Sequence, residues 1–263
     1  MTRSAMISVG GVQLETTTWI GQGTPILLLH EGLGSVSMWR DFPQRLAAAT
    51  GHTVVTWSRR GHGHSDPLPS SRNPDYMHVE AGLVPAVLDA LRIERAHLLG
   101  HSDGGSIALI AAARAPQRVA SLILFAPHVL VEQLTYDSIF RMKDVYRQSD
   151  LGRKLARHHA DADHTFWMWN DIWLDPRFRS WNIEALLPAI EAPALLIQGL
   201  DDEYGTLEQL DRIEAVLPAT RRLTLERCGH SPHRDQPDAV LAAIDGFLRE
   251  LPAVRADVLE GVA

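Results

Sequence analysis

The most informative segment of this chain is Ala96-His97-Leu98-Leu99-Gly100-His101-Ser102-Asp103-Gly104. Its apolar beginning is typical of a buried strand, and the apolar run that follows, Ile107–Ala113, is typical of a buried helix. Ser102 therefore lies in a sharp strand-to-helix turn, where glycines on both sides allow strained backbone and close approach of neighbouring segments. Such a turn projects the serine hydroxyl from the edge of the sheet, beside a helix N-terminus that favours negative charge.

Short apolar runs alternate with helical patterns through most of the rest of the chain. This alternation is typical of parallel strands that are covered by helices on both faces. The segment Val12–Ile20 alternates in polarity and predicts an antiparallel strand near the start. We therefore predict an α/β fold with a mostly parallel central sheet flanked by helices. The predicted buried strands are Ile26–Leu29, Thr53–Trp57, His97–Leu99, Leu122–Phe125, Ala194–Ile197 and Leu223–Leu225.

Two further sets of apolar residues recur at helical spacing, and we interpret both as core-facing helix surfaces. The tail after Pro252 has little pattern, and we expect it to fray. The two sets are Trp39, Phe42, Leu46 and Ala49, and Val240, Ile244, Phe247 and Leu251.

The segment 130–187 interrupts the alternation. It contains no convincing buried strand, and four of the seven tryptophans lie in it. Long loops without secondary structure are uncommon in compact domains, so a small helical subdomain is expected. We predict a core domain from residues 1–129 and 188–263 and a helical lid from residues 130–187. The four tryptophans are Trp167, Trp169, Trp173 and Trp181.

Composition and charge argue against several classes of function. The 263 residues are 45% hydrophobic and 22% charged, as expected of a soluble globular protein, and the net charge of −7 argues against a nucleic-acid partner. No apolar run is long enough to span a membrane, and Met1–Gly10 lacks the pattern of a secretory signal. Cys228 is the only cysteine, which excludes an intrachain disulfide and fits a cytoplasmic location. The oligomeric state stays open.

A serine hydroxyl needs a base to act as a nucleophile. In this type of fold the expected chain order is serine, acid and then histidine. The strand-like run Ala194–Gly199 leads into Asp201 and Asp202, and a later run leads to His230. Residues that follow parallel strands lie at the carboxyl edge of the sheet, where ligands bind, so both positions fit these roles.

The sequence resembles the α/β-hydrolase superfamily over nearly its whole length. The resemblance implies that the acid is Asp202, three residues after Gly199, and that the histidine is His230 rather than His233. It also implies an oxyanion hole built from the backbone N–H of Asp103 and a second N–H from Gly32 or Leu33. The matching segments are Leu27–Gly34, Ser58–Ser65, Gly100–Gly104, Gly199–Asp202 and Gly229–Pro237.

Three residues depart from the family's pattern. Glu31 stands between His30 and Gly32, where many relatives have His-Gly. Asp103 is acidic where relatives often have a neutral residue, and its carboxylate would oppose a developing oxyanion unless it is turned away. Ser58 stands where relatives often have Asp, and the sequence offers no functional reason for it.

Other chemically suggestive residues receive simpler interpretations. The segment His158–His164 resembles a metal site in composition, but no second ligand group accompanies it, so a solvated face of the lid is favoured. His62 and His64 are expected at the surface or behind the site, and Cys228 is expected to be a small packed residue. We predict no metal and no cofactor.

The leading hypothesis is hydrolysis of a small carboxylic ester or related acyl compound by Ser102, His230 and Asp202. A small molecule is then the only partner, and Trp167, Trp169 and Trp173 are the candidates for lining an apolar pocket. Within the same fold, the alternatives are cleavage of carbon–carbon bonds in ring-fission products, opening of enol-lactones, or removal of N-terminal proline. A slow-turnover, receptor-like binding protein and a metal-dependent enzyme are alternatives of other classes.

Overall fold

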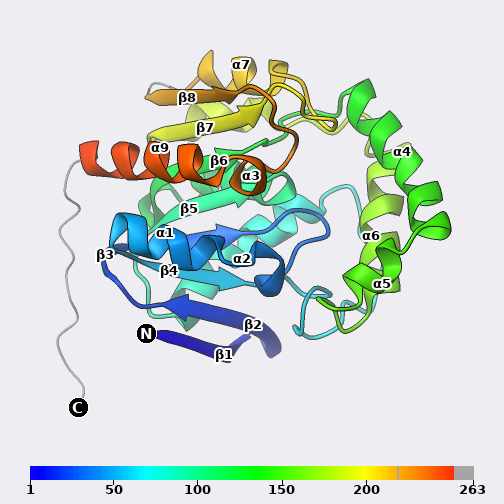
Figure 1. Cartoon of the computed structure of the whole chain (residues 1–263), viewed down its shortest axis with the longest axis horizontal. Coiled ribbons are helices and arrows are strands. Elements are labelled where there is room, and N and C mark those ends of the chain that lie inside the picture. Colours follow the sequence, from blue (N-terminus) through cyan, green and yellow to red (C-terminus); the bar gives the residue numbers. More distant parts are fainter. Residues whose placement is uncertain (218, 252–263) are drawn as a thin grey trace.

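The computed structural model describes residues 1–217 and 219–251, and its centre is one eight-stranded sheet (Figure 1). The strands lie in the order β1-β2-β4-β3-β5-β6-β7-β8. All pairs from β4 to β8 are parallel, and only the β1–β2 and β2–β4 pairs are antiparallel. The strands are β1 Thr2–Val9, β2 Val12–Trp19, β3 Gln22–Leu29, β4 His52–Trp57, β5 Ala96–His101, β6 Val119–Phe125, β7 Ala194–Gly199 and β8 Thr220–Leu225.

Every predicted strand is present, but strand β1 was not predicted. Most of Thr2–Val9 is exposed or half-buried, so this strand lacks the apolar run that marks the others. It pairs with β2 through a tight hairpin in which Val9 opposes Val12. The turn is made by Gly10 and Gly11, whose φ angles of 57° and 83° suit glycine.

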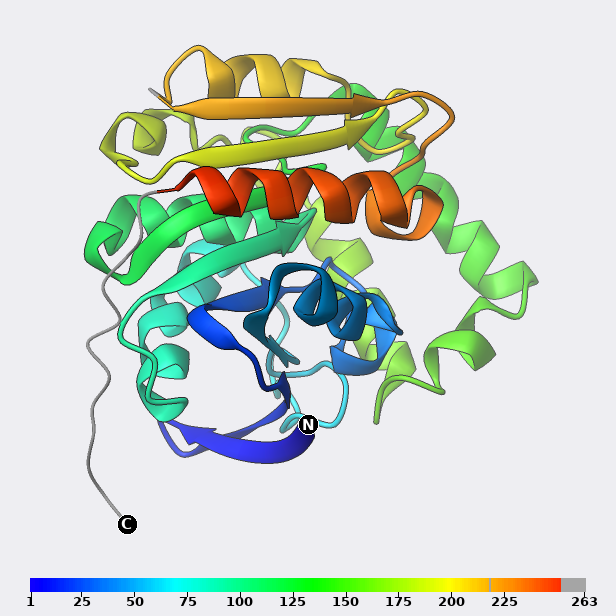
Figure 2. The same cartoon turned by 60° about the vertical axis from the view of Figure 1, so that its left-hand side comes forward.

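Apolar side chains on both faces of the sheet form two separate core clusters. Along β3, Leu27 and Leu29 enter one cluster while Ile26 and Leu28 enter the other, as the two-residue period of a strand requires. Figure 2 shows α9 lying across the front of the sheet, with α1 on the same face. Helices α2 and α3 cover the opposite face. These core helices are α1 Phe42–Thr50, α2 Tyr76–Ala90, α3 Asp103–Arg114 and α9 Pro237–Glu250.

One predicted helix face is divided in two. Trp39 belongs to the short 3₁₀ helix η1 (Val36–Trp39), and α1 begins only at Phe42. Arg40, between them, has a φ of 54°, which breaks helical continuity. The other predicted set of apolar residues lies in α9, except for Leu251, which follows the last residue of that helix. The expected fraying after Pro252 lies outside the described residues.

Residues 130–187 form helices and short turns rather than strands. The main helices, α4, α5 and α6, lie beyond the ends toward which the parallel strands point (Figure 1). A single antiparallel bridge between Leu130 and Asn182 joins the two ends of this segment. Its elements are α4 Gln133–Gln148, α5 Leu151–Leu155, α6 Ala162–Leu174 and η3 Glu184–Ala189.

The remaining elements are short and lie outside residues 130–187: η2 Pro116–Arg118, α7 Glu208–Glu214 and α8 Pro232–Asp235. In the part of the chain that the structure describes, no helix has the length and apolarity needed to cross a bilayer.

Candidate active site

Ser102 lies between the end of β5 and the first residue of α3, in a strained turn. Its φ and ψ are 53° and −118°, a combination that costs a non-glycine residue on the order of 1–3 kcal/mol. The flanking glycines are required by close packing. A Cβ atom on Gly100 would lie 2.2 Å from the Gly104 carbonyl oxygen, and one on Gly104 would lie 2.0 Å from the Leu29 carbonyl oxygen.

The loops after β7 and β8 meet beside this turn. A Cβ atom on Gly199, at the end of β7, would lie 1.9 Å from the carbonyl oxygen of Cys228, so only glycine allows the approach. The same carbonyl accepts the backbone N–H of Asp201 at 2.9 Å. These contacts place Asp202 next to His230.

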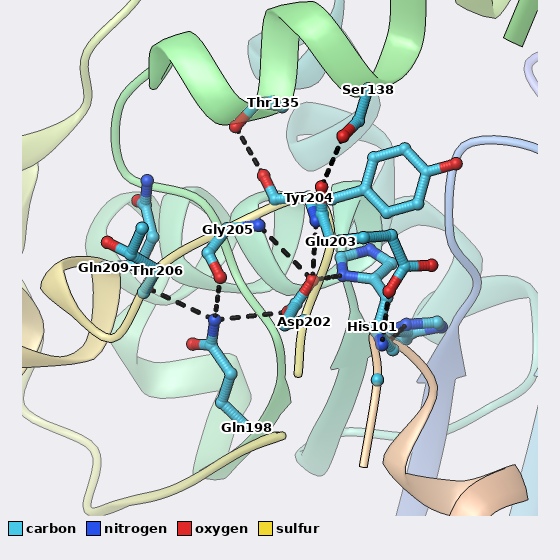
Figure 3. A network of polar contacts seen from close by, with 12 residues as sticks. His101, Thr135, Ser138, Gln198, Asp202, Glu203, Tyr204, Gly205, Thr206 and Gln209 are labelled. Carbon is cyan, nitrogen blue, oxygen red and sulfur yellow. Dashed lines mark hydrogen bonds and ion pairs between the residues drawn. The ribbon is translucent and has the colours of Figure 1, made fainter. Parts of the chain in front are cut away.

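Asp202, and not Asp201, contacts the imidazole. Its Oδ1 atom lies 2.8 Å from Nδ1 of His230 and also accepts the backbone N–H of Tyr204 at 2.8 Å (Figure 3). Its Oδ2 atom accepts Nε2–H of Gln198 at 3.2 Å. The carboxylate is almost fully buried, whereas Asp201 is exposed.

The electrostatics of this pair favour a charged imidazole. Burial alone would lower the pKa of His230, but the charge and hydrogen bond of Asp202 outweigh burial and raise that pKa above 6.5. Burial likewise opposes ionisation of Asp202, yet His230 holds the net pKa of this carboxyl below its ordinary value. The pair is therefore suited to hold a proton that another group has released.

Two further residues hold His230 in place. Nε2–H of His101 donates to the carbonyl oxygen of His230 at 2.7 Å, and the Tyr204 ring lies 4.8 Å from the His230 ring. His233 instead packs among apolar rings, 5.0 Å from Trp39 and 5.8 Å from Phe125. It contacts neither Ser102 nor Asp202 through a hydrogen bond.

Ser102 and His230 both line one cavity of about 210 Å³. The cavity lies between the carboxyl edge of the sheet and the helical insertion. Three carboxylic acids and one arginine contribute to its wall, so its charged groups are mainly acidic. The other walls are mostly apolar. These four charged residues are Glu31, Asp103, Glu203 and Arg234.

The candidate tryptophans separate into two groups. Trp169 and Trp173 line the cavity, and both are at least nine-tenths buried. Trp167 lies on another face of α6, where it contacts the Tyr146 ring and the Arg147 guanidinium. We therefore withdraw Trp167 from the predicted lining, because neighbouring positions on one helix cannot all share a face.

The carboxylate of Asp103 is held by three partners. Oδ2 accepts the Tyr76 hydroxyl at 2.8 Å, and Oδ1 accepts Nε1–H of Trp173 at 3.2 Å. The Arg59 guanidinium lies 3.8 Å from Oδ2 and is fully buried. These contacts fix the carboxylate and offset its negative charge, which would otherwise oppose a developing oxyanion.

The residues of the second predicted oxyanion donor also take definite positions. Gly32 and Leu33 both line the cavity. The Leu33 N–H donates to Oε2 of Glu31 at 2.7 Å. Ser58, which stands where relatives often have Asp, joins the chain after β3 to strand β2. Its hydroxyl accepts the Val36 N–H at 2.9 Å and donates to the Glu15 carboxylate at 2.8 Å.

The histidine-rich segment of the insertion makes separate hydrogen bonds. His158 contacts the Ser37 hydroxyl, His159 contacts the Gly63 N–H and the Leu33 carbonyl, and Nε2–H of His164 donates to the Leu68 carbonyl. Within residues 1–217 and 219–251, no group of three or more His, Cys, Asp or Glu side chains is arranged to hold a metal ion.

Several site residues were missed in the sequence. His128, shortly after β6, lines the cavity, and burial lowers its pKa to about 4. The strand-end argument that indicated Asp201 and Asp202 applies equally to His128 and could have found it. Tyr204 and Glu203 follow Asp202 directly, but nothing in their spacing indicates a contact with His230.

Known proteins resemble this chain over most of its length. A family model described as the alpha/beta hydrolase fold matches residues 24–161. The serine hydrolase BPHL of Homo sapiens is 30% identical over 94% of this chain and 86% of its own. The esterase YbfF of Escherichia coli strain K12 is 27% identical, with 86% and 94% covered. The 2-hydroxy-6-oxo-6-phenylhexa-2,4-dienoate hydrolase of Comamonas testosteroni is 24% identical, with 88% and 89% covered.

The fold and the site thus define a hydrolase built on a mostly parallel sheet. The chain belongs to the α/β-hydrolase family, which confirms the predicted fold class and the predicted enzyme class.

Proposed function

We propose that this protein is a serine esterase that cleaves small carboxylic esters through an acyl-enzyme. The observation that carries the proposal is the position of Ser102. It lies on a strained turn and lines the same cavity as His230, whose Nδ1 atom contacts the buried Asp202. A nucleophile, a base and an orienting acid are therefore supplied by three loops at one edge of the sheet.

The reaction begins when the Ser102 hydroxyl oxygen attacks the ester carbonyl carbon. Nε2 of His230 accepts the hydroxyl proton, and Asp202 stabilises the resulting imidazolium. The oxyanion accepts hydrogen bonds from the Asp103 N–H, at the start of α3, and from one amide of the loop after β3. His230 then protonates the departing alcohol, and a water molecule activated by His230 hydrolyses the acyl-enzyme. All groups needed come from the chain, so the proposed reaction uses no cofactor.

We interpret residues 130–187 as a lid over a core formed by residues 1–129 and 188–263. Trp169 and Trp173 bring apolar surface from α6 to the cavity that Ser102 also lines. His159 extends from the same segment to the Leu33 carbonyl at 2.9 Å. A segment that contributes to both the pocket wall and the nucleophile's surroundings would shield the cavity from bulk solvent while the water needed for deacylation still reaches His230.

Charge favours esters over ring-fission products. The dienoate in the name of the Comamonas testosteroni enzyme carries a carboxylate, which the Glu31 and Glu203 carboxyls in the cavity wall would repel. Arg234 is the one arginine or lysine among the residues that line the cavity, and its guanidinium already donates to the Met38 carbonyl at 3.1 Å. Carbon–carbon bond hydrolysis is therefore the second candidate, favoured only by the resemblance to that relative.

A substrate panel tests the proposal. Wild-type protein and Ser102→Ala are assayed with neutral p-nitrophenyl esters, a lactone, a proline arylamide and a ring-fission dienoate. We expect the neutral esters to give the highest kcat/KM and Ser102→Ala to lose several orders of magnitude in kcat. Unchanged esterase activity in Ser102→Ala would overturn the assignment. Turnover of the dienoate alone would select the second candidate.

A further inference from the structure

The loop after β3 is held by side chains that bind its consecutive carbonyl groups. The Arg59 guanidinium donates to the His30 carbonyl at 3.0 Å and to the Glu31 carbonyl at 3.1 Å. Nε2 of His62 lies 3.1 Å from the Gly32 carbonyl oxygen. Arg59 and His62 are almost fully buried, so the loop is supported from within the protein.

The same support reaches the next carbonyl from the helical insertion. Nδ1 of His159 accepts the Gly63 N–H at 3.0 Å, so Nε2 carries the proton that it donates to Leu33. Burial lowers the pKa of His159 to about 4 and that of His62 well below 6.5. Both rings are therefore neutral near pH 7, and each carries one N–H. His159 donates its N–H to Leu33, whereas the two nitrogens of His62 lie 3.1 Å from the Gly32 carbonyl and 3.2 Å from the Arg60 carbonyl, so the His62 ring donates to one of them at a time.

Fixed carbonyls also fix the amides, because the C=O of one residue and the N–H of the next point in opposite directions across a trans peptide. The Gly32 N–H therefore points away from Arg59, and the Leu33 N–H points away from His62. The Leu33 N–H is already bound to the Glu31 carboxylate at 2.7 Å. Among the described residues, no group accepts the Gly32 N–H.

Trp169 explains why position 32 is glycine. A Cβ atom there would lie 2.2 Å from Cδ1 and 2.3 Å from Nε1 of the Trp169 indole. The indole thus packs directly on the backbone of Gly32, at the wall of the cavity that contains Ser102. Any side chain at this position would displace the tryptophan from the Gly32 amide.

We propose that Glu31 is a positioning residue for catalysis: its carboxylate binds the Leu33 amide and so leaves the Gly32 amide as the second oxyanion donor. The inference rests on the proposed esterase function. It gives a role to the acid that interrupts the family's usual His-Gly sequence, and it chooses between the two donors that the sequence left open.

The surroundings of Glu31 reduce the effect that its negative charge would have on a developing oxyanion. Burial raises the pKa of Glu31, while Arg234, the bond from Leu33 and Arg59 act in the opposite direction. The charge of Asp103 also raises the pKa of Glu31. The positive charges of two arginines thus oppose the negative charge of the carboxylate, and the oxygen that binds Leu33 is turned toward that N–H.

Two variants test this role through kinetics. Glu31→Gln keeps an oxygen that can accept the Leu33 N–H, whereas Glu31→Ala removes it. We expect Glu31→Ala to lower kcat about tenfold with little change in KM, because a misaligned donor weakens only transition-state binding. Glu31→Gln should recover most of the lost kcat. Equal losses in both variants, or a higher kcat in Glu31→Ala, would contradict the proposal.

A second measurement uses the wild-type protein and does not depend on the stability of a variant. The ¹⁵N-labelled protein is titrated with phenylboronic acid, which forms a tetrahedral adduct with a nucleophilic serine. We expect the amide resonances of Gly32 and Asp103 to move downfield and that of Leu33 to move little. A large Leu33 shift with a small Gly32 shift would overturn the inference. Ser102→Ala is the control for the proposed function, which predicts that no adduct forms in this variant. An adduct that persists in Ser102→Ala would refute the proposed function rather than the role of Glu31.

Discussion

Oδ1 of Asp202 lies 2.8 Å from Nδ1 of His230 and at the same distance from the backbone nitrogen of Tyr204. One carboxylate oxygen thus binds both the imidazole and its own loop. The loop after β7 cannot shift without changing the orientation of the His230 ring, and the close approach at Gly199 keeps the two loops together.

We predict that Asp202→Asn lowers kcat for a neutral ester by about 10³–10⁴-fold. The amide leaves the geometry nearly intact but favours the wrong imidazole tautomer and cannot stabilise an imidazolium. Steady-state kinetics measure the loss. The matched control is Asp201→Asn, which changes the adjacent exposed acid and should stay within about twofold of wild type. An equal loss in the control would show that the acid was wrongly chosen.

The pH dependence of kcat/KM follows from the same pair. His230 acts as a base only when it is neutral, and its pKa is raised above 6.5. Activity should therefore fall as the pH drops through a midpoint above 6.5. Asp202→Asn removes the negative charge that outweighs burial. The pKa of His230, and with it the midpoint of the residual activity, should therefore move downward. A midpoint that moves upward, or does not move, would contradict this electrostatic account.

The cavity wall predicts a change in acyl-chain preference. Trp169→Ala and Trp173→Ala should each raise kcat/KM for long acyl esters relative to short ones, because truncation opens space in the wall. A change of about 1–3 kcal/mol in discrimination is expected. Trp167→Ala is the control, since Trp167 packs on Tyr146 outside the cavity. If only Trp167→Ala alters the preference, the assignment of the wall is wrong.

His233 predicts a specific acid instability. Burial lowers its pKa to about 3, whereas the unfolded chain protonates it near 6.5. The neutral ring therefore contributes fully above about pH 6.5, and its contribution is lost as the pH falls toward 3, by about 1.4 kcal/mol per unit.

His233→Phe should remove this loss, because the ring already packs among Trp39, Phe42 and Phe125. The free energy of unfolding, measured with urea at pH 8 and pH 5, should gain about 2 kcal/mol more at pH 5 than at pH 8. Any repacking cost is the same at both pH values and cancels. An identical change at the two pH values would contradict the prediction.

Sequence patterns predicted the sheet because most of its strands are buried on both faces. Ile26–Leu29 was recognisable as an apolar run, but the start of β3 at Gln22 carries no such signal. For the same reason β1, which is mostly exposed, could not be found. The predicted strand boundaries were wrong wherever the backbone pairing of a strand extends beyond its apolar residues.

The site was predictable only as far as local motifs reach. Ser102 and His230 follow glycine-containing turns at strand ends, which are visible in the sequence. The contact of His159 with Leu33 joins residues 126 positions apart, and no local pattern indicates it. The orientation of Trp167 depends on the rotation of α6 against the core, which spacing alone does not fix.

The central claim is that Ser102 is acylated during turnover. The most direct measurement is mass spectrometry of the protein after acid quenching in the first turnovers of p-nitrophenyl acetate, followed by peptide mapping. The account predicts one acetyl group per chain on the peptide that contains Ser102, and none in Ser102→Ala. An acetyl group on another residue in wild-type protein, with Ser102 unmodified while product is released, would contradict it.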